Sequence, residues 1–341
     1  MNENGACCQF TIDRMILAGD IGGTKALIGL FEFGEPRPLP VDIRSFSTTE
    51  YPALSSIIEK FYAAQRHRPA VTAAAFGVAG PVIDQSAEMT NVTWRVEAAE
   101  LSRDFALQNV RLLNDLEAMA YAVPVLETHE LETLQAGRRR DDGNLAIIAA
   151  GTGFGGAVLH HHGGRYVPVP SEVGHTDFAA RTDREIDLLR FIRERAGRVE
   201  VEHVVCGPGL LNLADFTHQG ARCTAFSPLD VPGAPAEVSK SALAGTCLHC
   251  VEALEMFVDA YGAVAGNLGL TAVTTGGVFI GGGIAPRILP ALQSGRFIQA
   301  FTDKGPMRSL LEGMPVHVIL NAEAGLLGAA VYANTMWSRD V

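Results

Sequence analysis

Leu17-Ala-Gly-Asp-Ile-Gly-Gly-Thr-Lys-Ala26 is a glycine-rich stretch that recurs in part as Ala149-Ala-Gly-Thr-Gly-Phe-Gly-Gly156. In each copy a short apolar run leads into a cluster of Gly and Thr, and a second apolar run follows it. This pattern predicts a strand, a tight turn and a second strand, so each copy is expected to form a β-hairpin rather than the start of a helix.

The two turns have the composition of anion-binding sites. Glycine lets the backbone approach a ligand closely, successive N–H groups in such a turn form a concavity for anions, and Thr24 and Thr152 add hydroxyl donors. Two such hairpins can hold one polyphosphate. Asp20 would repel phosphate unless a cation lies between them, so it is interpreted as a Mg²⁺ partner, acting through water. Either hairpin taken alone is also compatible with a purely structural turn.

Composition limits the class of protein. The chain has 341 residues, enough for two domains, with 48% hydrophobic residues, 36 Gly and a net charge of −11. The acidic balance argues against nucleic acid as a partner. No apolar stretch reaches the ~18 residues of a membrane span, and the N-terminus lacks the pattern of a signal peptide. We therefore expect a cytoplasmic protein with a loose tail over residues 1–13 and no membrane partner.

Six cysteines are too few for a disulfide scaffold, which suits a reducing compartment. Cys247-Leu-His-Cys250 has the spacing of half a zinc site, but no second pair follows it. Because it lies within an apolar pattern of helical period, core packing is the preferred interpretation.

Several polar residues lie where ligands commonly bind. A predicted strand over Val110–Leu113 runs into Asn114 and Asp115, and a helix is expected from residue 116 to 122. A carboxylate at the carboxyl end of a strand is well placed for a ligand in an open α/β sheet, although Asn and Asp are also favoured helix caps. Asn91 could likewise contact a ligand or cap a turn.

The prolines of Val167-Pro-Val-Pro-Ser-Glu-Val-Gly-His175 predict a loop. The spacings Glu172…His175 and Glu200…His203 resemble a di-iron signature, but that signature needs helices, so iron is rejected. Further on, a buried strand is expected to end in Gly281, Gly282 and Gly283.

Other families are excluded by missing motifs. The chain contains no Gly-Lys dipeptide and so no P-loop. It also lacks the His-Arg-Asp and Asp-Phe-Gly motifs of protein kinases and the Gly-x-Ser-x-Gly of α/β-hydrolases. Both glycine clusters lead into strands, which argues against a nicotinamide dehydrogenase.

The order of motifs resembles that of bacterial glucokinases, ATP-dependent sugar kinases of the actin/hexokinase/Hsp70 superfamily. The resemblance covers nearly all of residues 15–333. It is carried by the following motifs: Gly19-Asp-Ile-Gly-Gly-Thr24, Met89-Thr-Asn-Val-Thr-Trp94, Leu113-Asn-Asp115, Gly151-Thr-Gly153, Glu172-Val-Gly-His175, Cys206-Gly-Pro-Gly-Leu210, Gly277-Val-Phe-Ile-Gly-Gly-Gly283, Asp303-Lys-Gly305 and Gly325-Leu-Leu-Gly328.

The resemblance implies an α/β fold of two ribonuclease-H-like domains with mixed sheets and a central cleft, each domain contributing one hairpin. The expected division is a small domain over residues 14–125 plus about 316–341 and a large domain over 126–315. Sugar binding is expected to draw the domains together. A homodimer is the oligomeric state that this family suggests.

The resemblance also implies roles for individual residues. Asp115 would be the catalytic base, and the sugar hydroxyls would be held by Asn91, Asn114, Glu172, His175 and Glu202. The phosphates of ATP would contact Asp20, Gly22, Gly23, Thr24, Thr152 and Gly153, whereas Gly281, Gly282 and Gly283 would lie near the adenosine. Two departures, Lys25 after Thr24 and Val173 after Glu172, leave the sugar preference open. The Cys-rich zinc motif of the ROK sugar kinases is absent, which favours the glucokinase branch.

The expected reaction is phosphorylation of glucose at its 6-hydroxyl by ATP with Mg²⁺. The alternatives are a hexokinase of broader specificity and a non-catalytic sugar sensor of the same fold. A sensor would need a DNA-binding segment before Met15, and a chaperone- or actin-like ATPase would have no use for Glu172, His175 and Glu202.

Overall fold

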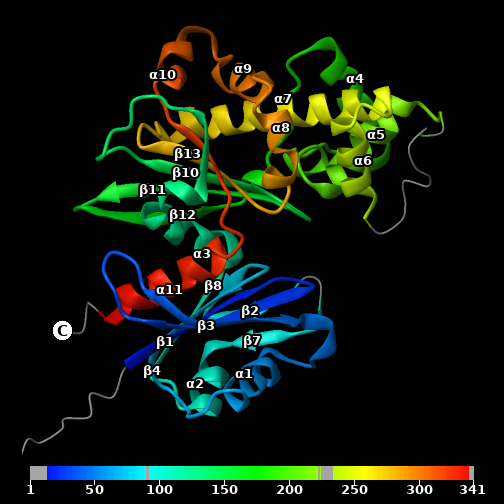
Figure 1. Ribbon diagram of the computed structural model, residues 1–341. Helices are drawn as coiled ribbons and strands as arrows, with labels where there is room; N and C mark the ends of the chain where they lie inside the picture. Colours follow the sequence, from blue (N-terminus) through cyan, green and yellow to red (C-terminus); the bar gives the residue numbers. More distant parts are fainter. Residues whose placement is uncertain (1–13, 90–91, 222, 224–232, 338–341) are drawn as a thin grey trace, which may run out of the picture. The chain divides into compact units, whose positions relative to one another are not determined.

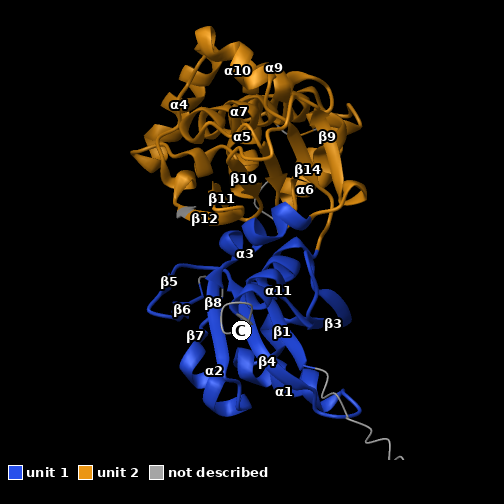
Figure 2. Ribbon diagram, turned by 90° about the vertical axis from the view of Figure 1, so that its left-hand side faces the viewer, with its two compact units in different colours: residues 1–125, 323–341 blue, residues 126–322 orange. Residues whose placement is uncertain are grey.

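The computed structural model describes residues 14–89, 92–221, 223 and 233–337. The chain divides into two compact units (Figures 1 and 2). Unit 1 combines the residues up to Val125 with those from Glu323 onward, and unit 2 comprises Leu126–Ala322.

Unit 1 is built on a five-stranded mixed sheet in the order β3-β2-β1-β4-β8. The β1–β2 and β2–β3 pairs are antiparallel, whereas β1–β4 and β4–β8 are parallel. The strands are β1 (Arg14–Ile21), β2 (Lys25–Glu32), β3 (Leu39–Ser47), β4 (Ala70–Val78) and β8 (Asn109–Asn114). The first glycine-rich stretch therefore forms the predicted hairpin, β1–β2.

Alternate residues of each strand point to opposite faces of this sheet, and helices cover both faces, so both are buried. On one face Leu17 packs with residues of α1 (Leu54–Ala63) and α2 (Ala98–Phe105). On the other face Ile16 packs with residues of α3 (Asp115–Ala122) and α11 (Ala324–Trp337). The sheet thus lies between two helical layers (Figure 1).

Small residues let α3 and α11 approach each other closely. A Cβ atom built on Gly328 of α11 would overlap the backbone carbonyl of Ala118 in α3. The two helices are therefore held at a separation that only glycine permits at position 328.

Unit 2 repeats this topology. Its sheet has the order β12-β11-β10-β13-β14-β9. The pairs β10–β11 and β11–β12 are antiparallel, and β10–β13 and β13–β14 are parallel, so β10 occupies the position that β1 has in unit 1. The strands are β9 (Leu131–Gln135), β10 (Leu145–Ala150), β11 (Phe154–His162), β12 (Arg165–Ser171), β13 (Gly277–Gly281) and β14 (Val316–Ile319). The second glycine-rich stretch forms the hairpin β10–β11.

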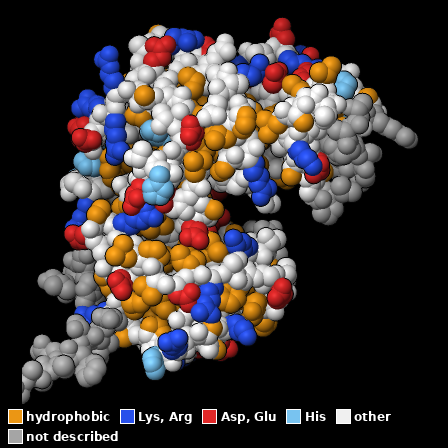
Figure 3. Space-filling model, in the orientation of Figure 1, with side chains coloured by type: hydrophobic (Ala, Val, Ile, Leu, Met, Phe, Trp, Pro, Cys, Tyr) orange, Lys and Arg blue, Asp and Glu red, His pale blue; other side chains and the backbone are white. Residues whose placement is uncertain are grey.

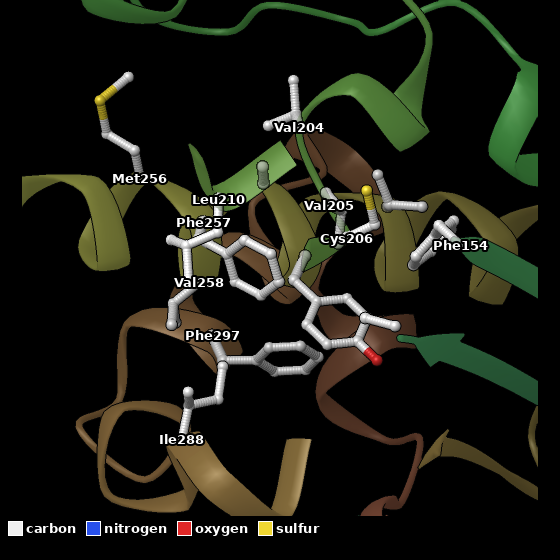
Figure 4. Close-up of a cluster of buried hydrophobic side chains, with 14 of the residues drawn as sticks. Phe154, Val204, Val205, Cys206, Leu210, Met256, Phe257, Val258, Ile288 and Phe297 are labelled. Carbon is white, nitrogen blue, oxygen red and sulfur yellow. The ribbon is translucent and has the colours of Figure 1, made fainter. Parts of the chain in front are cut away.

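Helices of unit 2 enclose a large apolar core. They are α4 (Asp183–Ala196), α5 (Gly207–His218), α6 (Ala234–Leu243), α7 (Leu248–Ala272), α8 (Leu289–Leu292), α9 (Arg296–Thr302) and α10 (Arg308–Glu312). In this core the fully buried Tyr261 meets Phe154, Phe257 and Phe297 edge to face, with ring centroids 5.7–5.8 Å apart. Figure 4 shows these three phenylalanines within one buried cluster, in which Phe154 lies on the side of Cys206. The cluster anchors the second hairpin, because Phe154 is the first residue of β11.

Two sequence expectations need correction. Residues 165–171 form strand β12 rather than a loop, because β12 is an edge strand of its sheet and prolines are tolerated at an edge. The chain was expected to return to the first domain at about residue 316, whereas it does so at Glu323. The reason is that β14 pairs in parallel with β13 and so belongs to the second sheet.

A small antiparallel sheet in unit 1 comprises β5 (Val82–Ile83), β6 (Ser86–Glu88) and β7 (Arg95–Glu97).

Acidic and basic side chains are interspersed on the face drawn in Figure 3. Among the described residues, no single helix has both the length and the apolar composition of a membrane span. Only α6 and α7 taken together reach them, and these helices meet at 101°.

Gly328→Ala is expected to lower the free energy of unfolding by about 1–3 kcal/mol, because the added methyl group overpacks the contact between α11 and α3. Gly325→Ala in the same helix is the matched control, since a methyl group there meets only the terminal atoms of the Asp20 side chain. Urea denaturation of both variants measures the difference. Equal stabilities would contradict the close helix contact.

Candidate functional site

The turn of the first hairpin presents backbone N–H groups. The N–H of Gly22 closes the turn on the carbonyl of Lys25 at 2.9 Å. The carbonyl of Gly23 accepts from the Thr48 hydroxyl at 2.8 Å, and that of Thr24 accepts from the Thr48 N–H at 3.2 Å. Within the part of the chain that the structure describes, the N–H groups of Gly23 and Thr24 have no acceptor. The turn therefore leaves two adjacent donors available to an anion.

The turn of the second hairpin has the same property. The carbonyl of Gly151 accepts from the N–H of Gly207 at 2.8 Å, and that of Gly153 accepts from the N–H of Gly151 at 2.8 Å. The N–H groups of Thr152 and Gly153 find no acceptor among the described residues. Each unit thus carries a glycine-rich turn in which carbonyl groups accept hydrogen bonds from the protein, whereas two adjacent N–H groups have no protein acceptor among the described residues.

Asp20 lies at the end of β1, beside the first turn, and is half-buried. Its carboxylate packs against Gly325 in the first turn of α11, where a Cβ atom would lie 2.7 Å from Oδ2. Burial, and to a smaller extent the charge of Asp115, raise the pKa of Asp20 from its usual 3.8 to about 6, while the charge of Lys25 opposes this shift. A carboxylate held in this way beside a second one suits a divalent cation that both could face.

The register of the first sheet explains why Asp20 and Asp115 share one edge. Asp20 lies opposite Gly77 of β4, and Gly77 lies opposite Leu113 of β8. Asp115 follows two residues later, at the start of α3. A Cβ atom on Gly77 would lie 2.8 Å from the Cβ of Ala118, so glycine at position 77 lets α3 begin close to the sheet. Both carboxylates are consequently at the carboxyl ends of parallel strands.

Asn114, rather than Asp115, is the cap of α3. Its Oδ1 accepts from the N–H of Leu116 at 3.0 Å and from that of Glu117 at 3.3 Å, while its Nδ2 donates to the carbonyl of Gly80 at 3.1 Å. Asp115 Oδ1 accepts from the N–H of Leu116 at 2.8 Å. The sequence left open whether Asn114 or Asp115 caps this helix. The structure shows that Asn114 is the cap, and its side chain fixes the start of the helix that carries Asp115.

In unit 2 a second group of polar residues surrounds His175, the last residue of the short helix η4 (Val173–His175). Its Nδ1 lies 2.7 Å from Glu200 Oε2. This hydrogen bond raises the pKa of His175, and the charges of Glu200, Glu202 and Glu172 act in the same direction, whereas partial burial opposes them. The structure thus brings Glu172, His175 and Glu202 into one electrostatic neighbourhood.

Glu202 connects this group to the second turn. Its Oε2 accepts from the N–H of Phe154 at 2.7 Å, and a Cβ atom on Gly153 would lie 2.8 Å from the same oxygen. Glu202 therefore helps to shape the turn whose donors are described above. Its predicted contact with a sugar hydroxyl stays a prediction.

A cavity of about 850 Å³ opens beside the second turn. It falls within the 300–1,000 Å³ range typical of ligand pockets. The turn contributes Gly151 and Thr152, the start of α5 contributes Gly207 and Pro208, and Lys240 and Arg287 supply positive charge. The remaining lining residues are Leu210, Gly233, Pro235, Ala236, Ser239, Leu243, Ala244, Gly283, Ile284 and Ile288.

The three glycines after β13 differ in their surroundings. Gly283 lines the cavity and has no atom within 4 Å of a built Cβ. Gly282 has a φ of +83° and packs on the backbone of Ala150, where any side chain would collide. The carbonyl of Gly281 accepts from the hydroxyl of the buried Tyr261 at 3.4 Å. Of the three, Gly283 is the residue in direct contact with the cavity.

Sequence reasoning missed Thr48, Gly325 and Glu200 as parts of these sites. Thr48 and Gly325 act through contacts with residues far away in the chain, which no local pattern reveals. The spacing of Glu200 and His203 was noticed but considered only as an iron signature. Asn91, a predicted sugar ligand, lies outside the described residues.

Comparison with known proteins gives a consistent result. The Glucokinase family model matches residues 17–336. The glucokinase of Nostoc sp. is 36% identical over 340 residues, which cover 94% of this chain and 98% of that protein. The crystal structure of a glucokinase from an Antarctic psychrotroph is 30% identical, with a TM-score of 0.83 and coverage of 94% of this chain and 99% of that one.

A more distant structure shows the shared fold alone. A ROK family glucokinase from Streptomyces griseus, solved in complex with glucose and AMPPNP, is 20% identical and has a TM-score of 0.63, with coverage of 94% of this chain and 99% of that one. Together with the topology, these neighbours confirm the expected actin/hexokinase-type fold.

Asp20→Asn is expected to stabilise the ligand-free protein at pH 7.5. The raised pKa means that the folded chain keeps a proton on Asp20 that the unfolded chain releases between about pH 4 and pH 6, so wild-type stability falls as the pH rises through this interval. At about 1.4 kcal/mol per pKa unit, the variant should gain about 2–3 kcal/mol at pH 7.5 and far less at pH 4.

Urea unfolding at both pH values measures this gain. The exposed carboxylate of Asp104 provides the control, because Asp104→Asn should change stability little at either pH. A loss of stability in Asp20→Asn at pH 7.5, or a gain that does not depend on pH, would show that the charged form of Asp20 does not destabilise the folded protein.

Proposed function

The chain belongs to the glucokinase family, and we propose that it transfers the γ-phosphoryl group of ATP to the 6-hydroxyl of D-glucose, which gives glucose 6-phosphate and ADP. One observation carries the proposal above the family match. Two topologically equivalent hairpins each offer a pair of unengaged N–H groups, and the sheet edge beside the first hairpin carries Asp115.

The nucleotide is proposed to occupy the cavity of unit 2. Apolar and glycine positions such as Pro208, Ile284 and Gly283 suit a flat adenosine that lies against backbone. Thr152 lines the same cavity at the turn, so the phosphates would extend from there toward its N–H donors. Lys240 and Arg287 favour an anionic ligand in this cavity by their charge. The donors of Gly23 and Thr24 in the first turn are likewise proposed to bind phosphate oxygens of ATP.

Glucose is proposed to bind to Glu172, His175 and Glu202, with further contacts from Asn91 and Asn114. The carboxylates accept hydrogen bonds from sugar hydroxyls, and the raised pKa of His175 favours a charged imidazolium that donates one. Asn114 still has a second N–H on Nδ2, beyond the one it donates to Gly80, that could contact the sugar.

Asp115 is proposed to act as the general base. Phosphoryl transfer passes through a loose transition state, so the protein mainly positions the reactants and stabilises charge. Asp115 would accept the proton of the 6-hydroxyl as that oxygen attacks the γ-phosphorus. Asn114 fixes the start of α3 and thereby the position of the Asp115 side chain. The turn N–H groups would bind the phosphate oxygens without reorganising.

Mg²⁺ fits the carboxylates of Asp20 and Asp115 at the edge of the unit 1 sheet. Burial of Asp20 and the nearness of Asp115 disfavour a bare negative charge there, and a hard divalent cation that binds oxygen ligands would offset it. When bound with ATP, Mg²⁺ supplies charge neutralisation of the β- and γ-phosphates. Asp20 would orient it, acting through water, while Gly325 leaves the carboxylate the room it occupies.

We further propose that the protein works in the cytoplasm as a homodimer, without a nucleic-acid or membrane partner. The net charge of −11 supports the exclusion of nucleic acid. Cys206, Cys223, Cys247 and Cys250 form no disulfide among the described residues, which suits a reducing compartment.

Asp115→Ala is expected to lower kcat by about 10²- to 10⁴-fold, the usual contribution of general-base catalysis, while the affinity for glucose changes little. Glu117→Gln, a change to the neighbouring carboxylate of α3, is the matched control and should keep near-wild-type turnover. A coupled assay of ADP release with and without glucose measures kcat, and isothermal calorimetry measures sugar binding.

Three results bear on the proposal. Turnover of Asp115→Ala near the wild-type value would reject its role as base. ADP release that does not depend on glucose would reject the sugar kinase activity itself. Titration of mannose, fructose and glucosamine against initial rate, with ATP and then polyphosphate as donor, defines the specificity, for which glucose and ATP are the expected best substrates.

A further inference from the structure

Four side chains that the proposed reaction does not use converge in unit 2. His218 is the last residue of α5, Cys223 follows that helix, Cys247 is the N-cap of α7, and Cys250 lies in its first turn. Their ligating atoms all lie within 4.8 Å of one another. Among the residues that the structure describes, this is the group of His, Cys, Asp and Glu side chains arranged closely enough to hold a metal ion.

The distances within the group approach those of a tetrahedral zinc site. Cys223 Sγ and Cys250 Sγ are 3.7 Å apart, and Cys247 Sγ and His218 Nε2 are 3.4 Å apart. With Zn–S bonds of about 2.3 Å and Zn–N bonds of about 2.0–2.1 Å, the edges of the tetrahedron are about 3.8 Å between sulfurs and about 3.6 Å between sulfur and nitrogen. Both pairs therefore lie close to the separation that one ion would impose.

The second ring nitrogen of His218 is oriented as in a metal-binding histidine. Its Nδ1 lies 2.6 Å from the carbonyl of Ala214. A carbonyl only accepts, so Nδ1 carries a proton, which leaves Nε2, 3.4 Å from Cys247 Sγ, as the ring nitrogen that could bind a metal. A hydrogen bond of this kind commonly fixes the tautomer of a zinc ligand.

The four residues lie mostly in the interior of unit 2. Cys247 and Cys250 are at the N-terminus of the 25-residue helix α7, whose dipole favours negative charge, whereas burial raises the pKa of the Cys250 thiol, so a bound cation would be needed to hold it as a thiolate. His218, Cys247 and Cys250 are buried. The interior position excludes water from the metal, so protein atoms would supply all four ligands, as in structural rather than catalytic zinc sites.

We propose that His218, Cys223, Cys247 and Cys250 bind one structural Zn²⁺ ion. The sequence alone favoured core packing for Cys247 and Cys250, because the second half of the site comes from α5 and not from a nearby Cys pair. A Cys223–Cys250 disulfide is the competing interpretation of the short Sγ–Sγ distance, but it leaves the convergence of His218 and Cys247 without a purpose.

The ion would also support the cavity. It would tie together positions 223 and 247, the two ends of the segment that carries α6, and α6 contributes Pro235, Ser239 and Lys240 to the cavity wall. This part of the inference rests on the proposed function, because it assigns that cavity to ATP. Loss of the ion should therefore raise the KM for ATP several-fold and leave the KM for glucose nearly unchanged.

Metal content tests the site directly. The untagged full-length protein, produced with zinc and gel-filtered without chelator, should contain one zinc per chain by mass spectrometry of the metal. Cys247→Ser and His218→Gln should lose most of it. His249→Gln is the matched control for histidine, because the His249 ring contacts that of His218 at a tilt of 45° but is not in the group. Cys206→Ser and the double variant Cys7→Ser/Cys8→Ser control for the other thiols, and all three controls should keep the zinc.

A second measurement does not depend on variants that could misfold. The wild-type protein is stripped with a chelator under reducing conditions and reloaded with Co²⁺, which should give thiolate-to-cobalt charge-transfer bands and the intense visible bands of a tetrahedral site. Removal of the metal should lower Tm. Absence of zinc together with absence of the charge-transfer bands would overturn the proposal, and so would a Cys223–Cys250 disulfide in protein freshly isolated from reducing cells. Zinc in a protein without glucose-dependent ADP release would instead overturn the proposed function alone.

Discussion

Backbone N–H groups without a protein acceptor are the feature on which the rest of this structure depends. In each hairpin turn the carbonyls are engaged: Thr48 holds those of Gly23 and Thr24, and the N–H of Gly207, at the start of α5, holds that of Gly151. The N–H groups of Gly23 and Thr24 in the first turn, and of Thr152 and Gly153 in the second, are left available to a ligand. Thr24 and Thr152 are exposed and Gly23 and Gly153 are partly buried, so water can meet these donors in the ligand-free protein. Adjacent N–H groups of this kind in both turns form the arrangement that suits an anion.

In unit 1 the fold brings the donors of the first turn and two carboxylates to one edge of the sheet. The parallel strands β1, β4 and β8 bring Asp20 and Asp115 to the same sheet edge, and glycines at positions 77, 325 and 328 allow α3 and α11 to pack closely enough to reach it. Burial and the neighbouring charge of Asp115 raise the pKa of Asp20, so its charged form is disfavoured in the ligand-free protein. Such a cost is typical of sites where function, and not stability, selects the residue.

Much of this could be predicted from sequence, because hydrophobic period and glycine clusters act locally. Both hairpins, the helix that follows Asp115 and the strand that ends in Gly281 were foreseen on that basis. What could not be foreseen depends on contacts between distant residues: Thr48 behind the first turn, Gly325 beside Asp20, and His218 close to Cys247. Strand β12 was missed because prolines indicate a loop until the strand is known to be an edge, and β14 was assigned to the wrong unit because nothing local identifies its partner strand.

Amide NMR of the full-length protein tests the central claim most directly. Complexes with AMPPNP, Mg²⁺ and glucose are compared with the ligand-free protein, and the ¹H and ¹⁵N shifts of Gly23, Thr24, Thr152 and Gly153 are followed. The account predicts large downfield proton shifts at all four amides and slower hydrogen exchange in both turns, because each N–H gains a charged acceptor. Unchanged shifts in either turn of a saturated complex would contradict it.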